Sequence, residues 1–83
     1  MSYYTYILQS ISNNRLYIGQ TNNLEDRLHR HNNNYNKATR NRGPWQLLYY
    51  AEFETRKEAI SLERKLKSWK NPEKVKEWFE ESV

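Results

Sequence analysis

The chain has 83 residues, which is the length of one small domain with a thin hydrophobic core. It contains no cysteine, and this excludes a disulfide framework, thiol chemistry and cysteine-based zinc sites. The net charge is +4, and because residues 71–83 hold two lysines against four glutamates, the preceding seventy residues carry +6, a balance typical of proteins that bind phosphate.

Two strands and a helix are predicted in the first part of the chain. Residues 3–9 (YYTYILQ) are aromatic and β-branched on both faces, which favours a central strand. A turn at Asn13 and Asn14 leads to a second strand at residues 16–20 (LYIGQ). A helix is expected to follow an asparagine cap. Its apolar face is formed by Leu24, Leu28, His31 and Tyr35.

The second part of the chain is predicted to add one strand and two helices. Residues 32–44 are polar and rich in asparagine, which indicates a long loop of the kind that is often functional. Residues 45–53 (WQLLYYAEF) have the composition of a third strand. A capping box at residues 55–58 opens a helix that runs to about Ser68. Residues 71–72 (Asn-Pro) then begin a short terminal helix.

These elements predict the α+β class. We expect a small three-stranded, partly antiparallel sheet flanked by helices, in the order β-β-α-β-α-α. A single domain is expected over residues 1–83, with its core at about 3–69 and a short C-terminal helix at 72–81. The apolar residues of that helix either cover the sheet, which is the favoured interpretation, or dock a larger protein. They are Val75, Trp78 and Phe79.

The N-terminal sequence MSYYTYILQS lacks the basic start and the apolar run of a signal peptide. No segment approaches the roughly 20 apolar residues that a helix needs to span a bilayer. We therefore expect a cytoplasmic protein without a membrane partner.

A basic stripe between residues 27 and 42 contains no acidic residue. It holds Arg27, Arg30, Lys37, Arg40 and Arg42. The last four are the predicted nucleic-acid-binding residues. The alternative is a charged loop that only keeps the protein soluble. Tyr35 and Trp45 could stack on unpaired bases, although Trp45 opens a strand and is more typical of a core residue.

Glu63 breaks the apolar pattern of the second helix. At about 100° per residue it falls inside the apolar arc between Ala59 and Ile60, where a carboxylate is partly desolvated. Its carboxylate either pairs with Lys67 or Arg56, or serves as an oxygen ligand for a divalent cation. Both interpretations remain open from the pattern alone.

Other polar groups converge near the hairpin. Arg27 and His31 are spaced i and i+4 on the first helix, a combination suited to holding a phosphodiester. Strand alternation places Tyr6 and Tyr17 on one face of the sheet. Gly19 shares that face and is expected to leave a space beside Tyr17 for the backbone of a ligand. For each tyrosine or histidine taken singly, core packing is the simpler explanation.

The spacing of these residues resembles that of a GIY-YIG nuclease domain, over about residues 3–69. Residues 17–19 match the YIG half of the motif in every letter. Of the GIY half, only the final tyrosine is kept, as Tyr6. Arg27 stands eight residues after the motif glycine, and His31 follows one helical turn later. Glu63 occupies the place of the family's metal-binding glutamate, on the helix after the third strand.

The resemblance implies an endonuclease that hydrolyses phosphodiester bonds in DNA, including branched or repair-related structures, with RNA as an open alternative. It implies one Mg²⁺ or Mn²⁺ ion on Glu63 and an Arg27 clamp on the phosphate. Tyr17 or Tyr6 would orient or deprotonate the attacking water, with His31 assisting. The implied catalytic residues are thus Tyr6, Tyr17, Arg27, His31 and Glu63, and Gly19 is the motif glycine.

Some positions depart from the family pattern. Tyr4 and Thr5 replace the glycine and isoleucine of the first half, and Gln20 stands where some members have a lysine after the motif glycine. The alternative function is therefore a non-catalytic nucleic-acid-binding module that retains the nuclease fold. Because many members owe target choice to an attached domain, a protein partner that supplies target specificity is a further expectation.

Overall fold

The computed structural model of the chain describes residues 2–33 and 43–81. Its elements are β1 (Tyr3–Ser10), β2 (Leu16–Thr21), α1 (Leu24–Asn32), β3 (Trp45–Phe53), α2 (Arg56–Ser68) and α3 (Pro72–Glu81). The predicted order and the α+β class are confirmed. The expected face of the first helix reached to Tyr35, but α1 ends at Asn32 and Tyr35 lies outside the described residues.

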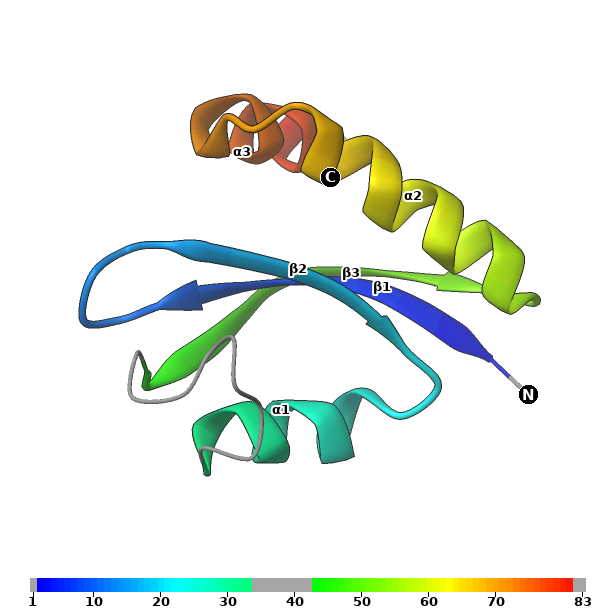
Figure 1. Cartoon of the computed structure of the whole chain (residues 1–83), viewed down its shortest axis with the longest axis horizontal. Coiled ribbons are helices and arrows are strands. Elements are labelled where there is room, and N and C mark those ends of the chain that lie inside the picture. Colours follow the sequence, from blue (N-terminus) through cyan, green and yellow to red (C-terminus); the bar gives the residue numbers. More distant parts are fainter. Residues whose placement is uncertain (1, 34–42, 82–83) are drawn as a thin grey trace.

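The strands form one sheet in the order β2-β1-β3, and both pairings are antiparallel. β1 lies in the middle, as its two apolar faces predict (Figure 1). In the register of the sheet, Tyr6 lies opposite Gly19 of β2 and Tyr50 of β3. The hairpin turn uses Asn14 at a φ of 62°, a conformation that asparagine tolerates well.

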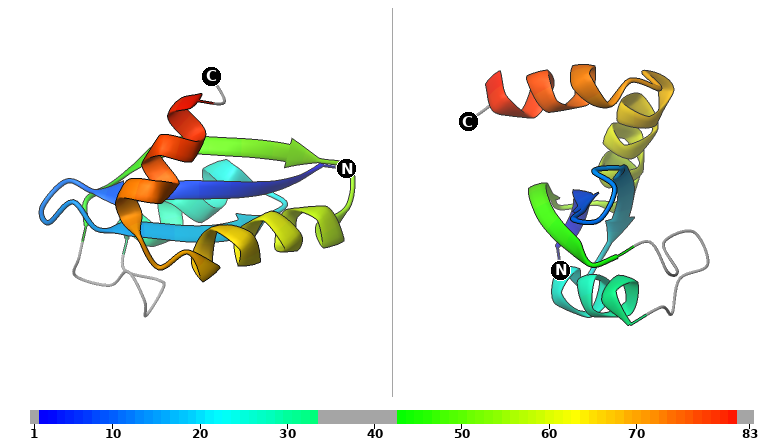
Figure 2. Two further views of the ribbon diagram at one scale, coloured as in Figure 1. Left: turned by 90° about the horizontal axis from the view of Figure 1, so that it is seen from above. Right: turned by 90° about the vertical axis from the view of Figure 1, so that its left-hand side faces the viewer.

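Helices cover both faces of the sheet. α1 packs on one face, and α2 and α3 lie on the other (Figures 1 and 2). The core on the α1 face is centred on Tyr6, Leu8 and Trp45. The core on the opposite face is centred on Ile7, Leu66 and Val75. Trp45 is only 5% exposed, so it is a core residue and cannot stack on bases as the alternative required.

Side chains fix the starts of α1 and α2. The Asn23 side-chain oxygen accepts a hydrogen bond from the Asp26 backbone at 3.0 Å, and the Thr55 hydroxyl accepts one from the Glu58 backbone at 3.3 Å. The Thr55 hydroxyl also donates to Glu58 Oε1 at 2.9 Å. Such caps stabilise a helix by about 1 kcal/mol each, and they set where the side chains of α1 and α2 point.

The aromatic residues of α3 pack on β3. Rings of Tyr49 and Trp78 lie 5.3 Å apart in an edge-on arrangement, and Tyr49 and Phe79 stack at 5.6 Å. Trp69 of the α2–α3 connection contacts Trp78 at 6.3 Å. The helix therefore covers the sheet, as the favoured interpretation predicts. Within residues 2–33 and 43–81, no helix has the length and apolar character needed to cross a membrane.

Candidate active site

Tyr6, Tyr17 and His31 form an aromatic cluster between the sheet and α1. The Tyr6 hydroxyl lies 3.0 Å from Nε2 of His31, and the two side chains are 2% and 1% exposed. The Tyr17 ring lies 4.7 Å from the His31 ring and 6.4 Å from the Tyr6 ring. The two tyrosines therefore share a face, as strand alternation predicts, and α1 brings the histidine to them.

Burial controls the protonation of this cluster. Burial and, to a smaller extent, the nearby Arg27 charge together lower the pKa of His31 from 6.5 to about 4. Burial also raises the pKa of Tyr6 well above its ordinary value; Tyr17 raises it further, Arg27 opposes the rise, and Glu63 adds to it. At neutral pH the imidazole is uncharged and the Tyr6 phenol keeps its proton. In the tautomer protonated at Nδ1, the phenol donates to Nε2.

Gly19 is required by the position of Tyr6. A Cβ atom at residue 19 would lie 2.5 Å from the Tyr6 hydroxyl oxygen and 2.7 Å from Cζ of the same ring. It would also lie 3.2 Å from Cε1 of Tyr17. The expectation of an open space beside Tyr17 for a ligand is wrong, because the Tyr6 ring fills that space. The glycine allows the two rings to pack against β2.

Arg27 brings an uncompensated positive charge to the cluster. Its Nε is shielded from solvent and has no hydrogen-bond partner among the described residues. No described residue forms an ion pair with its guanidinium either. A buried donor without a partner lowers the stability of the fold by roughly 1–3 kcal/mol, so a compensating ligand or function is expected. An anion bound at the guanidinium would provide one.

Glu63 lies on α2, which runs along the β2 edge of the sheet (Figure 2). Its side chain is only 19% exposed, and Oε2 lies 3.0 Å from Nζ of Lys67. The partner is therefore Lys67 and not Arg56, whose guanidinium donates to the Gln20 side chain at 3.2 Å. Of the groups that shift the pKa of Tyr6, the Glu63 carboxylate has the smallest effect.

The donor set around Glu63 fits a metal ion that takes some of its ligands from a bound substrate. Among the described residues, no group of three or more acidic or histidine side chains could hold a metal by itself. Mg²⁺ is often held by one or two carboxylates, with water and substrate phosphates completing the shell. The single half-buried carboxylate of Glu63 meets that requirement once Lys67 moves away.

Comparison with known proteins identifies the family. A sequence model described as the GIY-YIG catalytic domain matches residues 2–76. The chain belongs to the GIY-YIG family. It is 44% identical to a UPF0213 protein of Clostridium perfringens over 73 residues, covering 87% of this chain and 77% of the relative. It is 41% identical to a UPF0213 protein of Oceanobacillus iheyensis over 75 residues, covering 89% and 86%.

A solved structure has the same fold. The solution NMR structure of a UPF0213 protein from Bacillus halodurans superposes with a TM-score of 0.61 at 28% identity. The match covers 96% of this chain and 84% of that protein. The nuclease-type fold of the GIY-YIG family is therefore shown for this chain.

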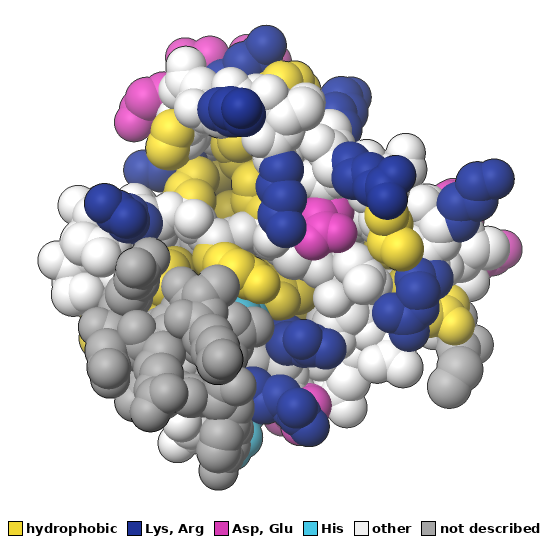
Figure 3. Space-filling view, viewed as in Figure 1, with side chains coloured by type: hydrophobic (Ala, Val, Ile, Leu, Met, Phe, Trp, Pro, Cys, Tyr) yellow, Lys and Arg dark blue, Asp and Glu magenta, His cyan; other side chains and the backbone are white. Residues whose placement is uncertain are grey.

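The predicted nucleic-acid contacts of this GIY-YIG domain are only partly described. Arg30 forms an exposed ion pair with Asp26 at 3.0 Å, which partly neutralises its charge. Lys37, Arg40 and Arg42 lie outside the described residues. Figure 3 shows basic side chains over α2 and over α1, on either side of acidic atoms near the middle of this face. The α2 cations were not predicted as contacts, although their helical spacing is visible in the sequence.

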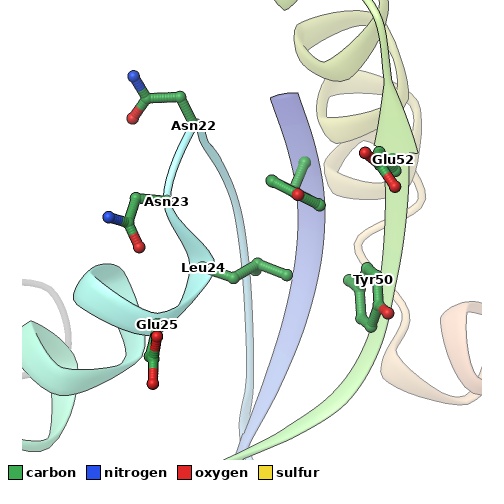
Figure 4. Close-up of a pocket in the computed structure, with 7 residues that line it drawn as sticks. Asn22, Asn23, Leu24, Glu25, Tyr50 and Glu52 are labelled. Atoms are coloured by element: carbon green, nitrogen blue, oxygen red, sulfur yellow. The ribbon is translucent and has the colours of Figure 1, made fainter. Parts of the chain in front are cut away.

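A hollow of about 340 Å³ lies away from the aromatic cluster, between the start of α1 and the end of β3 (Figure 4). Tyr50 and Leu24 line it, and Glu25 and Glu52 provide two carboxylates. No lysine or arginine is among its lining residues. Its lining includes no residue of the aromatic cluster, nor Arg27 or Glu63, so this hollow is separate from the candidate active site.

Proposed function

We propose that this GIY-YIG domain is a metal-dependent endonuclease that hydrolyses phosphodiester bonds in DNA, including branched or repair-related structures. The observation that carries the proposal is Arg27, whose Nε is buried without a partner among the described residues and whose charge acts on both Tyr6 and His31 of the aromatic cluster. Family membership supports the same chemistry. A phosphodiester would supply the anion that Arg27 lacks.

Tyr17 is the better phenol for contact with the attacking water. Tyr6 is nearly inaccessible, its pKa is raised by burial, and its hydroxyl is engaged with His31. Tyr17 is half-buried, with its ring against His31. We therefore assign Tyr17 to the water, and Tyr6 and His31 to positioning its ring. This assignment chooses between the two tyrosines that the motif leaves open.

Arg27 would bind a non-bridging oxygen of the scissile phosphate. A guanidinium offers several N–H donors in a fixed geometry, and its charge stabilises the charge that develops on the phosphoryl group. Its attachment to α1 beside His31 holds it in place before substrate arrives, which reduces the cost of ordering it.

Glu63 would hold the metal ion together with the substrate phosphate. A Mg²⁺ or Mn²⁺ ion bound there supplies a Lewis acid for phosphoryl oxygens and for the leaving group. The carboxylate must first exchange its ion pair with Lys67. Nζ of Lys67 then becomes free to approach a neighbouring phosphate.

The test is cleavage of labelled branched and linear DNA by the wild type and by Glu63→Gln in the presence of Mg²⁺ or Mn²⁺. The variant keeps the shape of the side chain and removes its charge, so we expect folding to persist and cleavage to disappear. Glu54→Gln, at an exposed residue before α2, is the control for loss of one negative charge. Equal cleavage by the wild type and Glu63→Gln would overturn the proposal.

A non-catalytic nucleic-acid-binding module is the second candidate. It is favoured by the Glu63–Lys67 ion pair, because the carboxylate already has a cationic partner within the protein. This function predicts salt-sensitive DNA binding that is unaffected by Mg²⁺ or by Glu63→Gln. Binding of the same DNA with and without Mg²⁺, measured by fluorescence anisotropy, separates the two candidates.

A further inference from the structure

The outward side of α2 carries positive charges that no role above uses. Arg56, Lys57 and Arg64 line a hollow of about 460 Å³, with Ile60 and Ser61 completing its lining. Positions 56, 60 and 64 are one helical turn apart, so they lie on one side of the helix. We call the three cations around this hollow the basic face of α2.

The charges of the basic face are not neutralised by the described residues. Neither Lys57 nor Arg64 forms an ion pair there. Arg56 contacts an uncharged amide and lies 4.9 Å from the centre of the Tyr3 ring, so it keeps its net charge. The two acidic residues of α2 are engaged elsewhere, because Glu63 pairs with Lys67 and Glu58 bonds to the cap residue before the helix.

The basic face continues from the candidate active site. At about 100° per residue, Arg56 and Lys67 are the next cations around the helix from Glu63, and Arg64 and Lys57 follow. Arg56 is also tied to Gln20, the neighbour of the motif glycine on β2. Figure 3 shows basic side chains of α2 beside the acidic atoms on this face. A DNA strand that extends from a phosphate bound at Glu63 would contact this surface first.

The length of the basic face matches several nucleotides. Arg56 and Arg64 are eight residues apart on the helix, which is about 12 Å at 1.5 Å per residue. Successive nucleotides of one duplex strand rise by about 3.4 Å, so the face spans roughly three to four phosphates. The apolar side chain of Ile60 between the cations can lie against sugars.

We propose that the basic face of α2 binds the DNA phosphate backbone a few nucleotides away from the bond that is cleaved. The inference rests on the proposed function for the location of the cleaved bond. It assigns to this domain a DNA-holding surface on α2, in addition to the predicted basic stripe at residues 27–42.

The test is the salt dependence of DNA binding in metal-free buffer, where no cleavage is expected. We would measure anisotropy of a labelled short duplex with the wild type and with Lys57→Gln/Arg64→Gln. The control is Arg15→Gln/Lys76→Gln, which removes one arginine and one lysine from the hairpin turn and from α3. Each pair therefore lowers the net charge equally.

We expect Lys57→Gln/Arg64→Gln to bind more weakly and to reduce the slope of log K against log salt by roughly 1.5 to 2, since each lost phosphate contact contributes about 0.9. The control pair should keep the wild-type slope. Equal slope changes in both pairs, or an unchanged slope in the α2 pair, would overturn the inference. The inference would also fail if the wild type did not bind DNA. It would fail too if the wild type bound polyglutamate more tightly than DNA and lost that binding in Lys57→Gln/Arg64→Gln.

The outcome is independent of catalysis. If the wild type binds DNA through α2 but never cleaves it with added metal, the proposed nuclease fails and the binding surface stands. If it cleaves DNA and the two variant pairs have the same salt slope, the nuclease stands and the α2 surface fails. Thermal unfolding of both double variants checks that each remains folded.

Discussion

The Tyr6 hydroxyl of β1 lies 3.0 Å from Nε2 of His31 on α1, and both side chains are almost completely buried. This hydrogen bond ties α1 to the central strand. It also holds the imidazole against the ring of Tyr17. His31, for which the family resemblance implies assistance in catalysis, thus has a structural role: it links α1 to β1 and packs against the Tyr17 ring.

The first prediction concerns pH and folding. The folded His31 has a pKa of about 4 against 6.5 for a free histidine, so the unfolded chain binds the extra proton between these values. The stabilisation is complete above pH 6.5 and is lost as the pH falls toward 4, by roughly 3 kcal/mol in total. Urea unfolding across this range measures the loss.

His29, an exposed histidine on the same helix, provides the control. His31→Gln should lose much of the pH dependence of its unfolding free energy between pH 6.5 and 4, while His29→Gln should keep the wild-type profile. Parallel profiles for the wild type and His31→Gln would show that carboxylates, and not His31, control acid unfolding.

The second prediction concerns Gly19. Gly19→Ala places a methyl group 2.5 Å from the Tyr6 hydroxyl oxygen, so a buried ring must move, at a cost of about 1–3 kcal/mol. Tyr6→Phe removes the nearest atom. The double variant Gly19→Ala/Tyr6→Phe should therefore be more stable than the sum of the two single changes indicates, by at least about 0.5 kcal/mol. Strict additivity in denaturant unfolding would contradict the packing described here.

The third prediction separates the two tyrosines. If Tyr17 contacts the attacking water, Tyr17→Phe should lower kcat by about 100-fold or more, as expected for loss of a proton-transfer group. Tyr6→Phe should lower stability but reduce kcat much less, because its hydroxyl faces His31. Single-turnover cleavage at fixed metal concentration makes the comparison, and the opposite ranking would assign the water to Tyr6.

The fourth prediction concerns Lys67. Its Nζ lies 3.0 Å from the Glu63 carboxylate and therefore competes with a metal ion for that oxygen. Lys67→Gln should tighten Mn²⁺ binding, measured by paramagnetic broadening of NMR signals near residue 63. Lys65→Gln, also on α2 but without this ion pair, is the matched control. Weaker binding in Lys67→Gln would show that the lysine supports the metal site instead of competing with it.

Much of this arrangement follows from the pattern of residues. The apolar faces of β1 predict its central place, and alternation alone places Tyr6 and Tyr17 on one face. Alternation does not say which ring lies over a glycine, so the space at Gly19 was wrongly expected to be open. Helical spacing puts Glu63 inside the apolar arc, but Lys67 and Arg56 are both within reach in sequence, and only the packed helix decides between them.

The basic face of α2 could have been found from spacing but was not predicted. Cations at 56 and 64 recur at the period of a helix face, which is also the ordinary pattern of a solvated surface. What distinguishes them is the engagement of Glu63 and Glu58 with other partners. Those contacts depend on rotamers and on the cap at Thr55, which the sequence pattern leaves undetermined.

The most direct test of the candidate active site compares Arg27→Gln with Arg30→Gln in single-turnover cleavage of DNA. Both changes remove one arginine from α1, but Arg27 has a buried Nε with no partner in the described part of the chain, while Arg30 is paired with Asp26 at the surface. We predict that Arg27→Gln loses about 100-fold or more in cleavage rate and that Arg30→Gln stays near the wild type. Equal rates for Arg27→Gln and the wild type would contradict the account.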